Sequence, residues 1–282
     1  SYYPFREDNV QAIYDSVRML LPERYADYNI SIITDRHRIE ELIPTYYRTK
    51  NLNAIRFTNR SEQPLVRRLS TENHPIEGLA GRHVAMWQSH GRYFEQDENI
   101  WRWQRSRLWE TVEDLFTQSF VLPYLVPMLE NAGANVLLPR ERDVQTTEII
   151  IDNDEGIDQS RYVEKNGSTK WSDAGTGFAH KREVYLTGQN PFREGSARST
   201  ETITSGNESL SEWHAAIPET GRYAVYVSYK SSGDKSTSDA TYTVHHAGGE
   251  SRFAVNQQMG GGTWVYLGSF FFKKGVHENQ SV

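Results

Sequence analysis

The sequence predicts an α/β part followed by an all-β part: a partial parallel-sheet domain and then an antiparallel β-sandwich. Residues 83–138 follow a strand–helix–strand order, which is typical of a βαβ unit with a parallel sheet. After residue 156 short apolar-alternating runs follow one another, separated by glycine-bearing turns, as in a sandwich. Glycine usage changes at the same point, since only 5 of the 20 glycines lie in residues 1–156.

The first 80 residues are expected to form an N-terminal α/β segment of unknown role. Apolar residues at helical spacing from Val10 to Leu21 predict a helix that Asp8-Asn9 would cap. Residues 29–34 and 54–58 favour strands, and residues 38–47 a short helix.

Residues 81–156 are predicted to hold the βαβ unit. A strand over residues 83–87 runs into the turn Ser89-His90-Gly91, and strands are expected at 135–138 and 148–151. Between them one apolar stripe predicts a long helix with a kink or break near residues 119–123, because two prolines each remove a backbone donor. Gly133 is expected to end that helix. The stripe consists of Leu108, Val112, Leu115, Ser119, Leu122, Val126 and Leu129.

Residues 157–282 are predicted to form the sandwich, with the boundary in the acidic passage at 152–156. Its strands are expected at 223–229, 241–245, 252–255, 263–267 and 270–272.

Composition excludes several classes of protein. The formal net charge of −6 argues against a nucleic-acid partner, and no apolar run reaches the 18 residues of a transmembrane segment. The absence of cysteine excludes disulfides and thiolate zinc sites, so that a zinc site would use histidine and carboxylate ligands. The first residues lack a signal-peptide pattern, so we expect any such segment to have been removed or never to have existed.

His90 is a candidate functional residue because it follows a strand at the sheet edge where ligands collect in α/β folds. The alternative is a hydrogen bond within a loop. Glu110 and Glu113 are expected to share a helix face, either as metal ligands or as a solvated polar face. Arg140 and Asp143 follow a strand and would pair with each other or bind a substrate carboxylate.

Two features of the second half leave similar alternatives open. The adjacent His245 and His246 would point to opposite faces of a strand, so we expect them to be structural. Trp171, Trp213 and Trp264 would either stack on sugar rings or pack in the core.

The stretch from Glu113 to Asp143, EDLFTQSFVLPYLVPMLENAGANVLLPRERD, resembles the zinc-dependent N-acetylmuramoyl-L-alanine amidase family. The strand and turn HVAMWQSHG resemble that family's first motif, whose histidine binds zinc. The resemblance implies that His90 and Glu113 are metal ligands for Zn, and it places Arg140 and Asp143 at the strand end as substrate-binding residues. The sequence departs from the motif at Trp87, Ser89, Arg92 and Pro139.

Residues 223–275 are similar to the golvesin C-terminal-like domain, also described as the xanthan-lyase carbohydrate-binding-like domain. The elements YTVHH, NQQ and TWVYLG carry this likeness. It implies a secreted, periplasmic or cell-envelope protein whose partner is peptidoglycan or another polysaccharide. It also implies a β-sandwich inserted in the amidase-like domain, with the chain ending as it enters the last sandwich strand.

Two functions follow from these resemblances. The first is a peptidoglycan-directed zinc amidase of which this chain is an incomplete, inactive piece, with the general base expected beyond residue 282. The alternative is a non-catalytic polysaccharide-binding envelope protein with a degenerate amidase scaffold.

Overall fold

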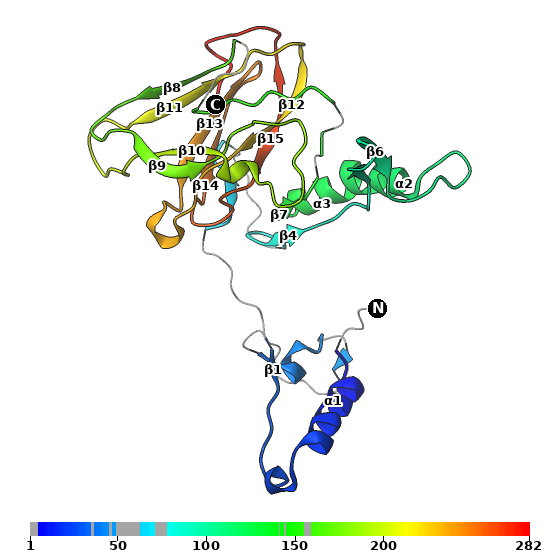
Figure 1. Cartoon of the computed structure of the whole chain (residues 1–282). Helices are drawn as coiled ribbons and strands as arrows, with labels where there is room; N and C mark the ends of the chain where they lie inside the picture. Colours follow the sequence, from blue (N-terminus) through cyan, green and yellow to red (C-terminus); the bar gives the residue numbers. More distant parts are fainter. Residues whose placement is uncertain are drawn as a thin grey trace. The chain divides into compact units, whose positions relative to one another are not determined.

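The computed structural model describes residues 5–34, 37–44, 47–48, 63–70, 78–140, 142–143, 145–154 and 159–282. The chain divides into two compact units, Ser1–Asn59 and Arg60–Val282. The fold is rich in β-strands, with few helices and several antiparallel sheets (Figure 1). No helix among the described residues is long and apolar enough to cross a membrane.

The first unit is built around the helix α1 (Glu7–Leu20). It also contains a 3-10 turn (Glu23–Tyr25), a hairpin of β1 (Ile33–Thr34) and β2 (His37–Arg38), and a second 3-10 turn (Ile39–Leu42). Val10, Ile39 and Ile43 form its buried core.

The predictions for this unit hold in outline and fail at the element boundaries. The helix begins at Glu7, and Asn9 lies inside it, where its side chain accepts the backbone N–H of Arg6 at 2.7 Å. The strand predicted over 29–34 shortens to two residues, and the predicted helix over 38–47 is a single 3-10 turn over four. The strand expected at 54–58 lies outside the described residues.

The βαβ unit is confirmed in the second unit. Strands β4 (His83–Ala85) and β7 (Asn135–Leu137) pair in parallel, and the helices α2 (Glu113–Phe120) and α3 (Val126–Asn131) connect them. A π-helical turn (Val121–Leu125) separates the two helices, which is the expected break near the prolines. Gly133 follows α3 with φ of +95° and ends it as predicted. The buried core here consists of Val126, Ala134 and Val136.

The predicted helix starts too early. Residues 92–103 form a hairpin of β5 (Arg92–Glu95) and β6 (Ile100–Trp103), and Leu108 and Thr111 exchange backbone hydrogen bonds of 2.9 and 3.2 Å. The chain turns between these two residues, where Trp109 has a φ of +56°. Glu110 therefore precedes the helix and does not share a helical face with Glu113, as the periodicity had indicated.

The second unit also contains an antiparallel β-sandwich. Its strands are β3 (Val66–Arg68), β8 (Arg161–Lys165), β9 (Ser172–Gly177), β10 (Gly195–Ser199), β11 (Leu210–His214), β12 (Gly221–Val227), β13 (Ala240–His246), β14 (Gly249–Val255) and β15 (Val265–Phe272). Two 3-10 turns, Pro191–Arg193 and Gly233–Lys235, lie between them. The pairs are β8 with β11, β9 with β10, β12 with β15, and β13 with β14. Strand β14 also pairs with β3 along its other edge.

The core of the sandwich lies between the β13–β14 pair and the β12–β15 pair (Figure 1). Ser281 and Val282 extend the first layer, because Ser281 exchanges backbone hydrogen bonds with His245 of β13 and Val282 with Trp213 of β11. The buried residues of the sandwich core include Val244, Phe253, Val255, Tyr223, Val227, Val265, Leu267, Phe270 and Phe272.

The strand predictions for the sandwich and for the end of the α/β part need three corrections. The strands expected at 263–267 and 270–272 are one strand, β15, because the backbone continues through Gly268 and Ser269 opposite β12. Strands β3 and β8–β11 were not predicted. Residues 148–151 form no strand; Ile149 instead packs its side chain against the sandwich core. The predicted boundary at residue 156 lies outside the described residues.

Arg142 joins the βαβ unit to the sandwich. Its guanidinium donates to Glu130 of α3 at 2.5 Å and to the carbonyl of Val136 in β7 at 3.0 Å. The same group lies 3.8 Å from the ring centre of Tyr266 in β15. One arginine therefore fixes β7 against a sandwich strand.

Candidate functional site

The turn Ser89-His90-Gly91 follows β4 and is held by one buried carboxylate. Asp114, the second residue of α2, is fully buried. Its Oδ1 accepts the Ser89 hydroxyl at 2.7 Å and the backbone N–H of Gly91 at 2.5 Å. The turn that presents His90 is thus positioned by the start of the helix that closes the βαβ unit.

The surroundings of Asp114 favour its charged form. Burial alone would raise its pKa, but the Gly91 N–H and the Ser89 hydroxyl bond the carboxylate, and the charges of His90 and Arg140 lie nearby. The net result is a pKa below the ordinary value for aspartate. Asp114 is therefore an anion at neutral pH, inside a site that contains an imidazole and a guanidinium.

Arg140 packs against the same turn. A Cβ built on Gly91 would lie 1.6 Å from Nη1 of Arg140, and Gly91 has a φ of +70°. The positive φ favours glycine at this position, and a side chain there would displace the end of the Arg140 side chain. Three buried polar atoms here have no hydrogen-bond partner among the described residues: Oε1 of Gln88, Oδ2 of Asp114 and Nη1 of Arg140.

The two predicted zinc ligands have unequal surroundings. His90 is half-buried, and its Nε2 lies 3.1 Å from Nη2 of Arg105, a group that can only donate a hydrogen bond. Glu113 is the first residue of α2, and its side chain is exposed. The described residues contain no group of three or more His, Asp or Glu side chains able to hold a metal ion. This donor set does not make a complete zinc site.

Of the two predicted substrate-binding residues, the structure brings only Arg140 to the His90 turn. Asp143 contacts the sandwich, where its carboxylate accepts the backbone N–H of Ala224 at 2.9 Å and also contacts Gln145. Asp114, which organises the turn, was missed by the sequence reasoning. An acidic residue in a first helical turn is common at the surface, and no pattern marks this one as buried.

The three tryptophans of the second half have different environments. Trp171 donates its indole N–H to the Leu210 carbonyl at 3.0 Å, and Trp213 packs on Tyr162 with ring centres 5.4 Å apart. Trp264, just before β15, is 40% exposed. Its ring is supported edge-on by Phe178 and Phe192, with ring centres 4.9 and 5.8 Å away.

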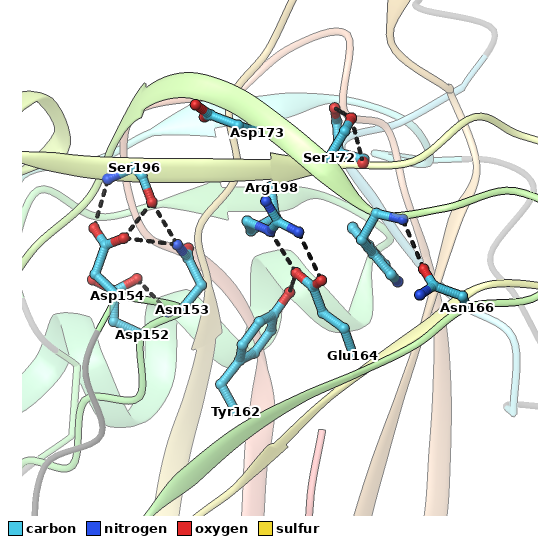
Figure 2. A network of polar contacts seen from close by, with 12 residues as sticks. Asp152, Asn153, Asp154, Tyr162, Glu164, Asn166, Ser172, Asp173, Ser196 and Arg198 are labelled. Atoms are coloured by element: carbon cyan, nitrogen blue, oxygen red, sulfur yellow. Dashed lines mark hydrogen bonds and ion pairs between the residues drawn. The ribbon is translucent and has the colours of Figure 1, made fainter.

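A polar network joins β8 to β10 (Figure 2). Glu164 of β8 accepts two hydrogen bonds from Arg198 of β10, at 2.6 and 2.8 Å, and a third from the Tyr162 hydroxyl at 2.8 Å. Arg198 lowers the pKa of Glu164, while burial and the Glu164 charge raise that of Tyr162. Asp154 bonds the backbone N–H of Ser196 at 2.6 Å, also on β10. The satisfied contacts indicate a structural role for this network.

The comparisons with known proteins give one family. Residues 184–282 match the family described as the Golvesin C-terminal domain, which covers the part of the chain that contains β10–β15. No curated protein and no solved structure matches the chain.

Proposed function

We propose that this protein binds polysaccharide at the cell envelope through its β-sandwich. The observation that carries the proposal is the match of residues 184–282 to the Golvesin C-terminal domain. The likeness noted above for residues 223–275 gives that domain a carbohydrate-binding character. A protein with this role acts in the periplasm, on the envelope or outside the cell.

Trp264 provides the surface best suited to a sugar ring. An aromatic face packs against the C–H groups of a sugar while the hydroxyls remain in water. Phe178 and Phe192 make T-shaped contacts with the Trp264 ring, and 40% of the residue stays exposed. A ring fixed in this way binds with little loss of side-chain entropy.

The test is co-sedimentation of the full chain with insoluble peptidoglycan and with other insoluble polysaccharides. We expect retention on at least one of them, and a reduction of about tenfold or more in Trp264→Ala. Trp109→Ala is the matched control, because Trp109 is 89% exposed and lies outside the matched residues. Absence of retention on every polysaccharide would contradict the proposal, as would equal loss in both variants.

A second candidate function is an amidase-type hydrolase that cuts the bond between the lactyl group of a glycan and its peptide stem. The observation that favours it is the parallel β4–β7 pair with the His90 turn beyond β4, held by a buried carboxylate. In this candidate His90 and Glu113 are two of the zinc ligands. Any further ligand would have to come from residues outside those that the structure describes.

Zinc binding by calorimetry tests this candidate separately from turnover. We expect weak binding by the chain that His90→Ala and Glu113→Gln both abolish, while His180→Ala, at an exposed position, leaves it unchanged. We also expect no amidase turnover by residues 1–282. Zinc binding that survives both substitutions would refute the ligand assignment.

A further inference from the structure

A hollow of about 510 Å³ opens on the sandwich, and Trp264 is not among the residues that line it. It lies where the end of β13, the β13–β14 turn and residues 273–280 meet. Its volume falls within the range of roughly 300–1,000 Å³ that is usual for small-ligand sites. The lining residues are His245, His246, Ala247, Gly249, Glu250, Lys273, His277, Asn279 and Gln280.

Hydrogen bonds within the protein hold the loop that lines one side of the hollow. The buried Gln280 accepts the backbone N–H of Lys273 at 2.6 Å and donates back to its carbonyl at 3.3 Å, which closes the loop 273–280. His277 contacts the Lys274 carbonyl through Nε2 at 2.9 Å. The loop therefore holds its shape without a ligand.

His246 belongs to the wall. Its ring stacks on Phe270 at 4.9 Å, its Nδ1 accepts the N–H of Gly248, and its Nε2 lies 3.2 Å from the Ser251 hydroxyl. Both ring nitrogens are thus engaged. Burial, with the charges of Arg68 and His245, lowers the pKa of His246, which keeps the ring neutral. The expected structural role holds for this histidine, although both histidines line the hollow.

Other side chains that line the hollow are available to contact a ligand. The Lys273 ammonium and the Asn279 carboxamide make no hydrogen bond or ion pair with the residues that the structure describes. The Glu250 carboxylate also lines the hollow, with its oxygen 3.9 Å from Nδ1 of His245. The hollow therefore offers one ammonium without an ion-pair partner, together with the Glu250 carboxylate, an amide and imidazoles that bond hydroxyl groups.

From this arrangement we propose that the hollow binds an acidic saccharide unit, with its carboxylate on Lys273 and its hydroxyls on Asn279, His245 and His277. A single unpaired ammonium matches a monovalent carboxylate better than a divalent phosphate, and a charge-assisted bond of this kind is about twice as strong as a neutral one. The inference rests on the proposed polysaccharide binding and adds the charge class of the ligand and the place where it binds.

The test measures binding of tetragalacturonate to the full chain by calorimetry. Its methyl ester is the ligand control, because it keeps the chain length and removes the charge. We expect the acid to bind about tenfold or more tightly than the ester, and Lys273→Gln to lose that difference. Lys274→Gln is the matched protein control, since Lys274 is adjacent and exposed but does not line the hollow.

Three results would overturn the inference. One is equal affinity for the acid and the ester; another is an unchanged affinity for the acid in Lys273→Gln; the third is no binding of either. If neutral polysaccharides still retain the protein through Trp264 in the sedimentation assay, the proposed function stands and only the acidic site fails. Asn279→Ala supplies a second variant, expected to weaken both ligands alike because it removes a contact to hydroxyls.

Discussion

Removing the Asp114 carboxylate is expected to release the turn that presents His90. In Asp114→Ala the Ser89 hydroxyl and the Gly91 N–H both lose their acceptor, at a site with no solvent exposure. A bond to a charged group contributes about 1.5–3 kcal/mol, and a buried donor left without an acceptor costs about 1–3 kcal/mol. Asp114→Asn keeps one carbonyl oxygen for both donors, so we expect a smaller loss of about 1–2 kcal/mol.

Two measurements check this expectation. Urea denaturation gives the change in the free energy of unfolding, and amide hydrogen exchange of the peptide that contains Gly91 reports the local bond. Glu113→Ala is the control, because this neighbouring side chain is exposed at the helix start and should contribute less than about 1 kcal/mol. Unchanged exchange at Gly91 in Asp114→Ala would refute the reasoning.

The same residue predicts a pH dependence. A carboxyl whose pKa is depressed in the folded state contributes stability above its unfolded pKa, here 3.8, and loses it as the pH falls through the lower folded pKa. The stability difference between the wild type and Asp114→Asn should therefore stay constant from neutral pH to about 4 and shrink in stronger acid. A difference that shrinks between pH 7 and 5 would contradict the assignment.

Three further predictions concern other contacts. Gly91→Ala should destabilise by more than about 2 kcal/mol in urea denaturation, whereas Gly81→Ala, with the similar φ of +68° but open space around its Cβ, should lose only the backbone term of about 1–2 kcal/mol; equal losses would contradict this. Glu164→Gln should lower the urea midpoint in the same assay because it leaves Arg198 without its carboxylate, and an unchanged midpoint would show the pair to be dispensable. Burial raises the pKa of Asp152 to about 6, so its contribution to stability is present below pH 3.8 and lost as the pH rises through about 6. In Asp152→Asn the unfolding midpoint should therefore depend less on pH between about pH 4 and 7. A pH dependence equal to that of the wild type would refute this.

The sequence by itself determined the elements whose signal is local. The proline pair and Gly133 located the break and the end of the helical segment, because a missing backbone donor and a positive φ act within one turn. Alternating apolar residues located β12, β13 and β14 for the same reason.

Only the tertiary structure decided which residues meet. Glu113 and Asp114 are adjacent acids at one helix start, yet one is exposed and the other fully buried under the turn after β4. Asp143 and Arg140 lie three residues apart, yet Asp143 accepts the backbone N–H of Ala224 within β12 and Arg140 packs on Gly91. Burial and partnership depend on segments distant in the chain, such as β3 on β14 or Ser281 on β13, and a pattern read along one strand or helix contains no information about its neighbours in space.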